Sequence, residues 1–71
     1  MKNKYSIYYN DELIQNFSNE EEMVQFIINI DKFPYRFIAT GRNLYLLVFR
    51  DPRFFCTYEE KRYVPRFVIK T

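Results

Sequence analysis

The sequence predicts an α+β fold in which one helix packs on a curled antiparallel sheet, with the order ββαββββ in a single small domain of residues 1–71. Three observations predict it. Short runs rich in aromatic and β-branched residues recur along the chain, as strands require. One segment repeats its apolar residues with the helical period. Turn-forming residues separate these runs, and no repeat or low-complexity segment interrupts them.

The chain begins with a predicted hairpin. Lys4 to Tyr9 and Glu12 to Phe17 are its strands, because both runs contain residues that suit a pleated, half-buried surface. Asn10 and Asp11 separate the strands and tolerate the positive φ of a two-residue turn.

A helix is predicted from about Asn19 to Ile30. Ser18 followed by Glu21 matches the capping box, and three glutamates fall in the first turn, where negative charge suits the helix dipole. Pro34 limits the helix, since proline disfavours the α conformation in the residue before it. One apolar stripe at positions i, i+3, i+4 and i+7 should pack on the sheet: Met23, Phe26, Ile27 and Ile30.

Two strands are predicted next, Tyr35 to Thr40 and Asn43 to Arg50. They form a second hairpin whose turn, Gly41-Arg42, contains the only glycine of the chain, where a positive φ is sterically free.

The remaining segments alternate between turn and strand. Asp51 to Arg53 is predicted as a turn, Phe54 to Tyr58 as a strand, Glu59 to Arg62 as a charged turn, and Tyr63 to Lys70 as the last strand. Pro65 cannot donate a backbone hydrogen bond, so the last strand is placed at a sheet edge.

Composition predicts a folded chain that gains stability from association. An aromatic content of 21% argues against disorder, but 71 residues bury too little surface for a wide stability margin. Cys56 is the only cysteine and there is no histidine, so we expect no disulfide within the chain, no metal and no cofactor. Without an apolar signal core or a long apolar run, we expect a cytoplasmic protein with no membrane span.

One predicted strand is apolar on both sides. In Asn43 to Arg50, one face carries Leu44, Leu46 and Val48, and the other carries Tyr45, Leu47 and Phe49. A single helix covers one face only. The second face is covered by curling of the sheet, by a second copy of the chain, or by a different partner.

Catalysis is not expected. Histidine, the usual acid or base partner, is absent. Ser6 lies in a predicted strand, Ser18 is assigned to the helix cap, and Cys56 in an apolar strand is typical of a small core residue.

Charge is divided unevenly along the chain. Met1 to Lys32 has three basic and six acidic residues, whereas Phe33 to Thr71 has eight basic and three acidic residues and contains all six arginines. Arginine and aromatic residues are enriched at binding interfaces and also suit phosphate contacts and base stacking. The predicted partner-binding residues are Tyr35, Arg36, Arg50, Arg53, Phe54, Tyr58, Arg62 and Arg66.

These features predict a non-enzymatic protein-binding module that forms a homodimer and binds a further protein. The composition resembles that of small accessory proteins of phages and mobile elements, which implies a host protein as partner and inhibition or redirection of a host macromolecular machine. Two alternatives remain open: a single-stranded nucleic-acid-binding protein that uses the same residues, and a structural homo-oligomer.

Overall fold

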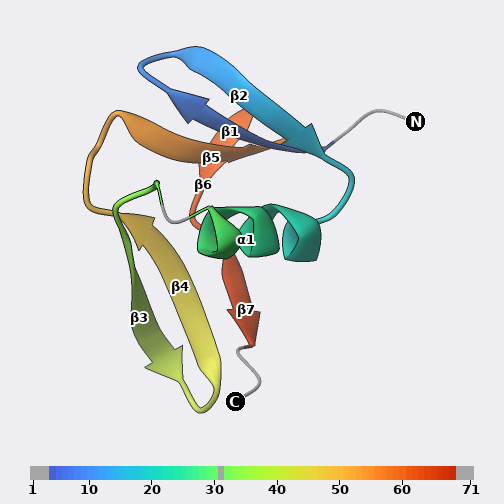
Figure 1. The fold of residues 1–71 in the computed structure, drawn as a ribbon. Coiled ribbons are helices and arrows are strands. Elements are labelled where there is room, and N and C mark those ends of the chain that lie inside the picture. Colours follow the sequence, from blue (N-terminus) through green and yellow to red (C-terminus); the bar gives the residue numbers. More distant parts are fainter. Residues whose placement is uncertain (1–3, 31, 69–71) are drawn as a thin grey trace.

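The computed structural model describes residues 4–30 and 32–68. In these ranges the elements are β1 (Tyr5–Tyr9), β2 (Glu12–Phe17), α1 (Glu20–Asn29), β3 (Tyr35–Gly41), β4 (Leu44–Phe49), β5 (Phe54–Tyr58), β6 (Lys61–Tyr63) and β7 (Arg66–Val68). Antiparallel pairing joins β2-β1-β5-β6 into what we call the first sheet and β3-β4-β7 into the second sheet. Figure 1 shows the first sheet above α1 and the β3–β4 hairpin below it.

The division into two sheets corrects the prediction of one curled sheet. The described residues contain seven strands rather than six, because the predicted last strand, Tyr63 to Lys70, is divided into parts that belong to different sheets. Its final residues, 69 and 70, lie outside the described residues. The predicted charged turn is also shorter, since Lys61 and Arg62 belong to β6.

Pro65 explains the division. It has no N–H to donate to a sheet, and it lies fully buried between β6 and β7. Its carbonyl accepts a hydrogen bond from the Leu47 N–H at 3.0 Å, which ties the crossing segment to the second sheet. Pro65 therefore lies where the chain leaves the first sheet for the second.

The first hairpin agrees with the prediction, and the second differs at its turn. Asn10 and Asp11 have φ of 51° and 68°, as a two-residue turn of this kind requires. Gly41 does not have a positive φ, so that expectation is wrong. β3 extends through Gly41, with an irregularity in its pairing between Ala39 and Gly41, and Asn43 takes the positive φ of 61°. Asparagine tolerates this conformation better than most residues.

The helix is capped one residue later than predicted. Asn19 is the N-cap, and its Oδ1 accepts a hydrogen bond from the Glu22 N–H at 2.8 Å. The Ser18 hydroxyl donates to Glu22 Oε2 at 3.0 Å instead of capping through Glu21. The predicted cap and the observed cap would each supply a side-chain acceptor for a backbone N–H group at the helix start. The helix therefore begins close to the predicted residue.

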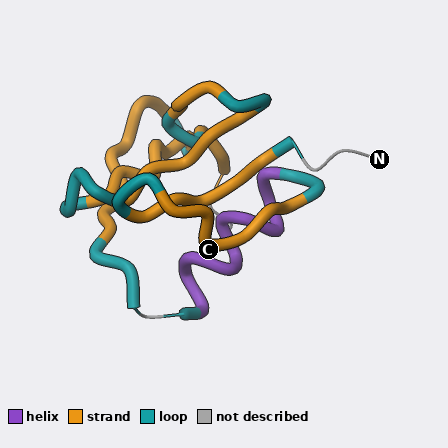
Figure 2. The backbone as a smooth tube through the Cα atoms, turned by 90° about the horizontal axis from the view of Figure 1, so that it is seen from above, coloured by secondary structure: helices purple, strands orange, loops and turns teal. Residues whose placement is uncertain are grey.

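The core lies between α1 and the inner faces of the two sheets. The helix contacts β1 and β2, and Figure 2 shows it along one side of the strands. The buried apolar side chains come from both sheets and the helix: Ile7, Phe17, Met23, Val24, Ile27, Leu47 and Cys56.

Aromatic rings connect the helix to both sheets. Phe33 follows the helix, and its ring centroid lies 6.1 Å from that of Phe26 in α1 and 5.0 Å from that of Phe54 in β5. Phe54 also lies 5.6 Å from Phe49 in β4. Because these contacts cross from one sheet to the other, they hold the two sheets together in addition to the backbone crossing at Pro65.

Candidate functional site

The second sheet has one face in the core and one face outside it. Residues that pair across antiparallel strands share a face, so the register assigns each side chain to a side. Leu47 pairs with Phe37, and Leu46 pairs with Ile38 on one side and Arg66 on the other. Leu47 is 2% exposed and belongs to the core, so Leu46 and its pairing partners lie on the opposite face.

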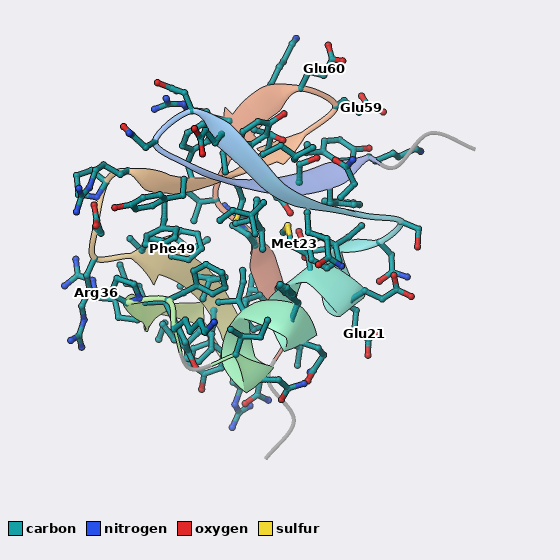
Figure 3. All side chains as sticks on the ribbon, turned by 45° about the horizontal axis from the view of Figure 1, so that its top comes forward. Glu21, Met23, Arg36, Phe49, Glu59 and Glu60 are labelled. Atoms are coloured by element: carbon teal, nitrogen blue, oxygen red, sulfur yellow. The ribbon has the colours of Figure 1, made fainter. Side chains whose placement is uncertain are left out.

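The core face of the second sheet holds its aromatic side chains. They are half-buried and pack on the core or on one another: Tyr35, Phe37, Tyr45, Phe49 and Phe67. Figure 3 shows Phe49 pointing between the two sheets, whereas Arg36 points away from them.

The opposite face, which we call the open face, consists of aliphatic and arginine side chains. Its members are Arg36, Ile38, Leu44, Leu46, Val48, Arg66 and Val68. Ile38 and Val68 are 38% and 58% exposed, and the three β4 residues are half-buried beside them. The pairing of β3, β4 and β7 therefore makes these apolar side chains one continuous surface.

The charges on the open face are all positive. Arg36 on β3 pairs with Val48, and Arg66 on β7 pairs with Leu46, so the two arginines lie on opposite sides of β4. Both are exposed, and among residues 4–30 and 32–68 neither forms an ion pair. Their guanidinium groups are therefore available to a carboxylate from outside the described chain.

The outer face of the first sheet is built differently. Tyr8 pairs with Phe55 and their rings are parallel, with centroids 5.2 Å apart. On the other side of Phe55, the Arg62 guanidinium lies 3.9 Å from the ring centroid and its Nη2 lies 3.8 Å from Asp11 Oδ1. Tyr8, Phe55 and Arg62 thus form a column across three strands in which neighbouring side chains cover one another.

Polar side chains continue this outer face. The buried Ser6 hydroxyl donates to Asn16 Oδ1 at 2.5 Å, and the buried Thr57 lies across from Ser6 in the register. They line a hollow of about 590 Å³ whose rim includes Lys4, Glu59 and Glu60. The rim thus combines one lysine with two glutamates.

The structure brings together some of the eight residues predicted to bind a partner and separates others. Arg36 and Arg66 lie on the open face, and Arg50 is exposed directly after β4. Tyr35 is half-buried on the core face of the second sheet. Arg62 belongs to the outer face of the first sheet, so the eight residues do not share one surface.

The other three predicted residues have partners within the chain. Phe54 belongs to the aromatic contacts between the sheets. Tyr58 packs against Tyr5, with ring centroids 4.8 Å apart. The Arg53 guanidinium forms a two-pronged ion pair with Asp51, with Nε 3.0 Å from Oδ1 and Nη2 2.8 Å from Oδ2. Hydrogen bonds from Arg53 hold the pKa of Asp51 below its usual value.

Two titratable groups on the inner side of the first sheet are shielded from water. Burial raises the pKa of the Cys56 thiol to about 12, with a further contribution from the negative charge of Glu20. Burial also raises the pKa of Tyr63, whose hydroxyl donates to Glu20 Oε2 at 3.1 Å. A thiol with so high a pKa is protonated at neutral pH, which makes it a poor nucleophile.

Sequence reasoning missed the aliphatic members of the open face. Ile38 and Val68 were not among the predicted site residues, and neither were the three β4 residues. The signal was present in Asn43 to Arg50, which is apolar on both sides. Strand alternation shows that two apolar faces exist, but only the tertiary structure shows which one the core covers.

Within residues 4–30 and 32–68, no group of three or more acidic or cysteine side chains is placed to hold a metal ion. None of the described helices has the length and apolar character to cross a membrane. Searches against protein-family models, curated proteins and solved structures give no significant match to this chain.

Proposed function

We propose that this chain is a small non-enzymatic protein-binding module that binds its partner through the open face of the second sheet. The observation that carries the proposal is the aliphatic strip along β4, which lies on the face opposite the core, is half-buried between the exposed Ile38 and Val68, and has an arginine on either side. An apolar centre with arginine at its rim matches the composition of protein interfaces.

The partner that we propose is a host protein. The compositional resemblance to accessory proteins of phages and mobile elements supports this extension, since small proteins of that kind act by stoichiometric binding. A module of 71 residues would then inhibit or redirect a host macromolecular machine by occupying a surface that the machine needs.

Single-stranded nucleic acid has less support as the partner. Bases stack on aromatic rings, but the open face carries aliphatic side chains, and the aromatic rings of the second sheet lie on its core face. On the first sheet, Tyr8 and Arg62 cover the two sides of Phe55. The arginines and aromatic residues that alternate in the sequence therefore separate onto opposite faces of the second sheet.

Site-specific photo-crosslinking in the cells that naturally contain the protein tests the proposal. A benzophenone amino acid replaces Ile38 on the open face or, as the matched control, Leu13 on the first sheet, which is also exposed. After irradiation, mass spectrometry identifies the crosslinked species. We expect a specific protein to be crosslinked from position 38 and not from position 13.

Two outcomes contradict the proposal. If position 38 crosslinks only to nucleic acid, or only to a second copy of the chain, the open face is not a surface for a different protein. If the same proteins crosslink from both positions with equal yield, the open face has no selectivity over the outer face of the first sheet.

A further inference from the structure

We infer that the segment that occupies the open face is an acidic amphipathic helix of the partner protein. This inference rests on the proposed function and adds to it the chemistry and the shape of the bound element. It follows from the dimensions of the open face, from the placement of its two arginines, and from the absence of a matching element in the described part of this chain.

The dimensions fit one helix. Leu44 to Val48 spans about 13 Å along β4, and three strands about 4.8 Å apart place β3 and β7 about 10 Å from one another. An α-helix is about 10 Å wide and rises about 1.5 Å per residue, so roughly nine to twelve residues cover this strip. The apolar stripe of such a helix would lie on Leu44, Leu46 and Val48.

The arginines indicate the charge of the occupant. Because Arg36 and Arg66 flank β4 on opposite sides, a helix that lies along β4 has one arginine beside each of its two flanks. Glutamate or aspartate on both flanks would each meet a guanidinium group, which binds carboxylates in a two-pronged geometry. Lysine on the flanks would meet like charge and bind more weakly.

A second copy of this chain does not supply such a helix. In α1 the apolar residues Met23, Val24 and Ile27 are buried, and the exposed residues Glu21, Glu22 and Gln25 are polar, so no acidic apolar stripe is presented. Contact between two open faces would join two surfaces whose charged side chains are both arginines.

An extended strand is the other shape to consider. It would pair with the free backbone edge of β3 or β7, because those strands end the second sheet. Pairing at one edge leaves the strip on β4 uncovered and reaches only the arginine on that side. The helix accounts for both arginines and the strip together.

Fluorescence anisotropy with three labelled synthetic peptides of 14 residues tests the inference. The first has leucine at i, i+3, i+4, i+7 and i+11 with glutamate on both flanks. The second has the same leucines with lysine on the flanks. The third has the composition of the first in an order that removes the stripe. We expect the first peptide to bind at least about tenfold more tightly than either of the others, since it alone combines apolar packing with two favourable charge contacts.

Charge reversal of the arginines locates the contact. The double variant Arg36→Glu/Arg66→Glu should weaken binding of the first peptide by about tenfold or more and improve binding of the second. The matched control, Lys61→Glu/Arg62→Glu, makes the same charge change on β6 and should alter both affinities less than about threefold. Far-UV circular dichroism checks that the variants remain folded, and amide shifts in NMR spectra of the natural chain should change in β3, β4 and β7.

The inference is overturned if the peptides with glutamate and lysine flanks bind equally, if the reordered peptide binds as well as the first, or if the two double variants behave alike. Amide shifts confined to the first sheet, or to the edge of β3 or β7 alone, would also overturn it. Photo-crosslinking from position 38 distinguishes failure of this inference from failure of the proposed function. If a protein is crosslinked there but the glutamate peptide is not preferred, the acidic helix is wrong and the protein-binding function still stands.

Discussion

On the outer face of the first sheet, Arg62 lies over Phe55 and Phe55 stacks on Tyr8, whereas on the open face of the second sheet Arg36 and Arg66 pair with the aliphatic Val48 and Leu46. Both faces contain arginine beside apolar groups. In the first, the arginine completes contacts within the chain, and in the second, the arginines form no ion pair among residues 4–30 and 32–68.

The contacts of an arginine, and not its presence in a basic and aromatic segment, therefore indicate whether it is available to a partner. Arg53, which is paired with Asp51 and lies 5.2 Å from the centre of the Tyr9 ring, belongs with Arg62 in this respect. Of the predicted binding arginines, only Arg36, Arg50 and Arg66, which lie on or beside the second sheet, form neither an ion pair nor an aromatic contact among residues 4–30 and 32–68.

Neighbouring leucines of β4 give the largest expected effect. Leu47→Ala removes a core side chain and should reduce the free energy of unfolding by about 2 to 5 kcal/mol. Leu46→Ala, on the open face, should reduce it by less than about 1.5 kcal/mol but weaken partner binding by about tenfold. Urea unfolding and binding assays on both variants check this, and equal losses of stability would contradict the assignment of the two faces.

Cys56 follows Phe55 in β5, and its side chain is buried in the core. Ionisation of its thiol should lower the free energy of unfolding at alkaline pH. Its pKa is raised to about 12 in the folded state, so the unfolded chain loses the thiol proton first. The stabilising contribution is complete below about pH 8.5 and should fall by about 1.4 kcal/mol per pH unit above it.

Urea unfolding at pH 7, 9 and 10 measures this slope, to which Tyr63, whose pKa is also raised in the folded state, contributes at the upper end of the range. The control variant Cys56→Ala should be less stable at neutral pH because it leaves a small cavity, but its stability should change less between pH 9 and 10. An identical slope in the two proteins would show that the thiol reaches water in the folded state.

Phe55→Ala tests the outer face of the first sheet. The substitution removes the stack on Tyr8 and the contact with Arg62, and should reduce the free energy of unfolding by about 1 to 3 kcal/mol. Partner binding should remain within about threefold of the natural value at temperatures where the variant is folded, since Phe55 is not on the open face. A large loss of binding at unchanged stability would move the binding surface to the first sheet.

Local sequence patterns predict the elements of this fold better than their assembly. The bounds of β2 and β5 match the predicted runs, because turn residues limit both runs and the alternation within them is clear. The division into two sheets depends on the pairing of β1 with β5 and of β4 with β7, which are distant in the chain. Pro65 indicated an interruption, but one residue does not show which sheet the chain joins next.

For the candidate site, the sequence predicted the arginines but not the face on which each aromatic residue lies. Arg36, Arg50 and Arg66 are among the predicted residues because arginine is enriched at interfaces. Tyr35 and Phe54 were selected for the same reason, although their rings pack within the molecule. The position of an aromatic ring on one face or the other follows from strand register and packing, so composition alone could not separate these residues from the open face.

Two turns of the first sheet have the same backbone conformation. Glu59 and Glu60 between β5 and β6 have φ of 51° and 68°, the values found at Asn10 and Asp11 between β1 and β2. Glutamate disfavours this left-handed conformation, whereas asparagine and aspartate tolerate it. Glu59→Asn/Glu60→Asp should therefore stabilise the protein by about 1 kcal/mol, measured by urea unfolding.

Two further variants separate backbone strain from charge in this turn. Glu59→Gln removes the same charge without favouring a positive φ, so it should give less than half of the gain. Asn10→Glu/Asp11→Glu transfers the unfavourable residues to the other hairpin and should destabilise the protein by a similar amount. If Glu59→Gln stabilised as much as the double variant, repulsion among the acidic side chains at the rim of the hollow, and not strain in the turn, would be the cause.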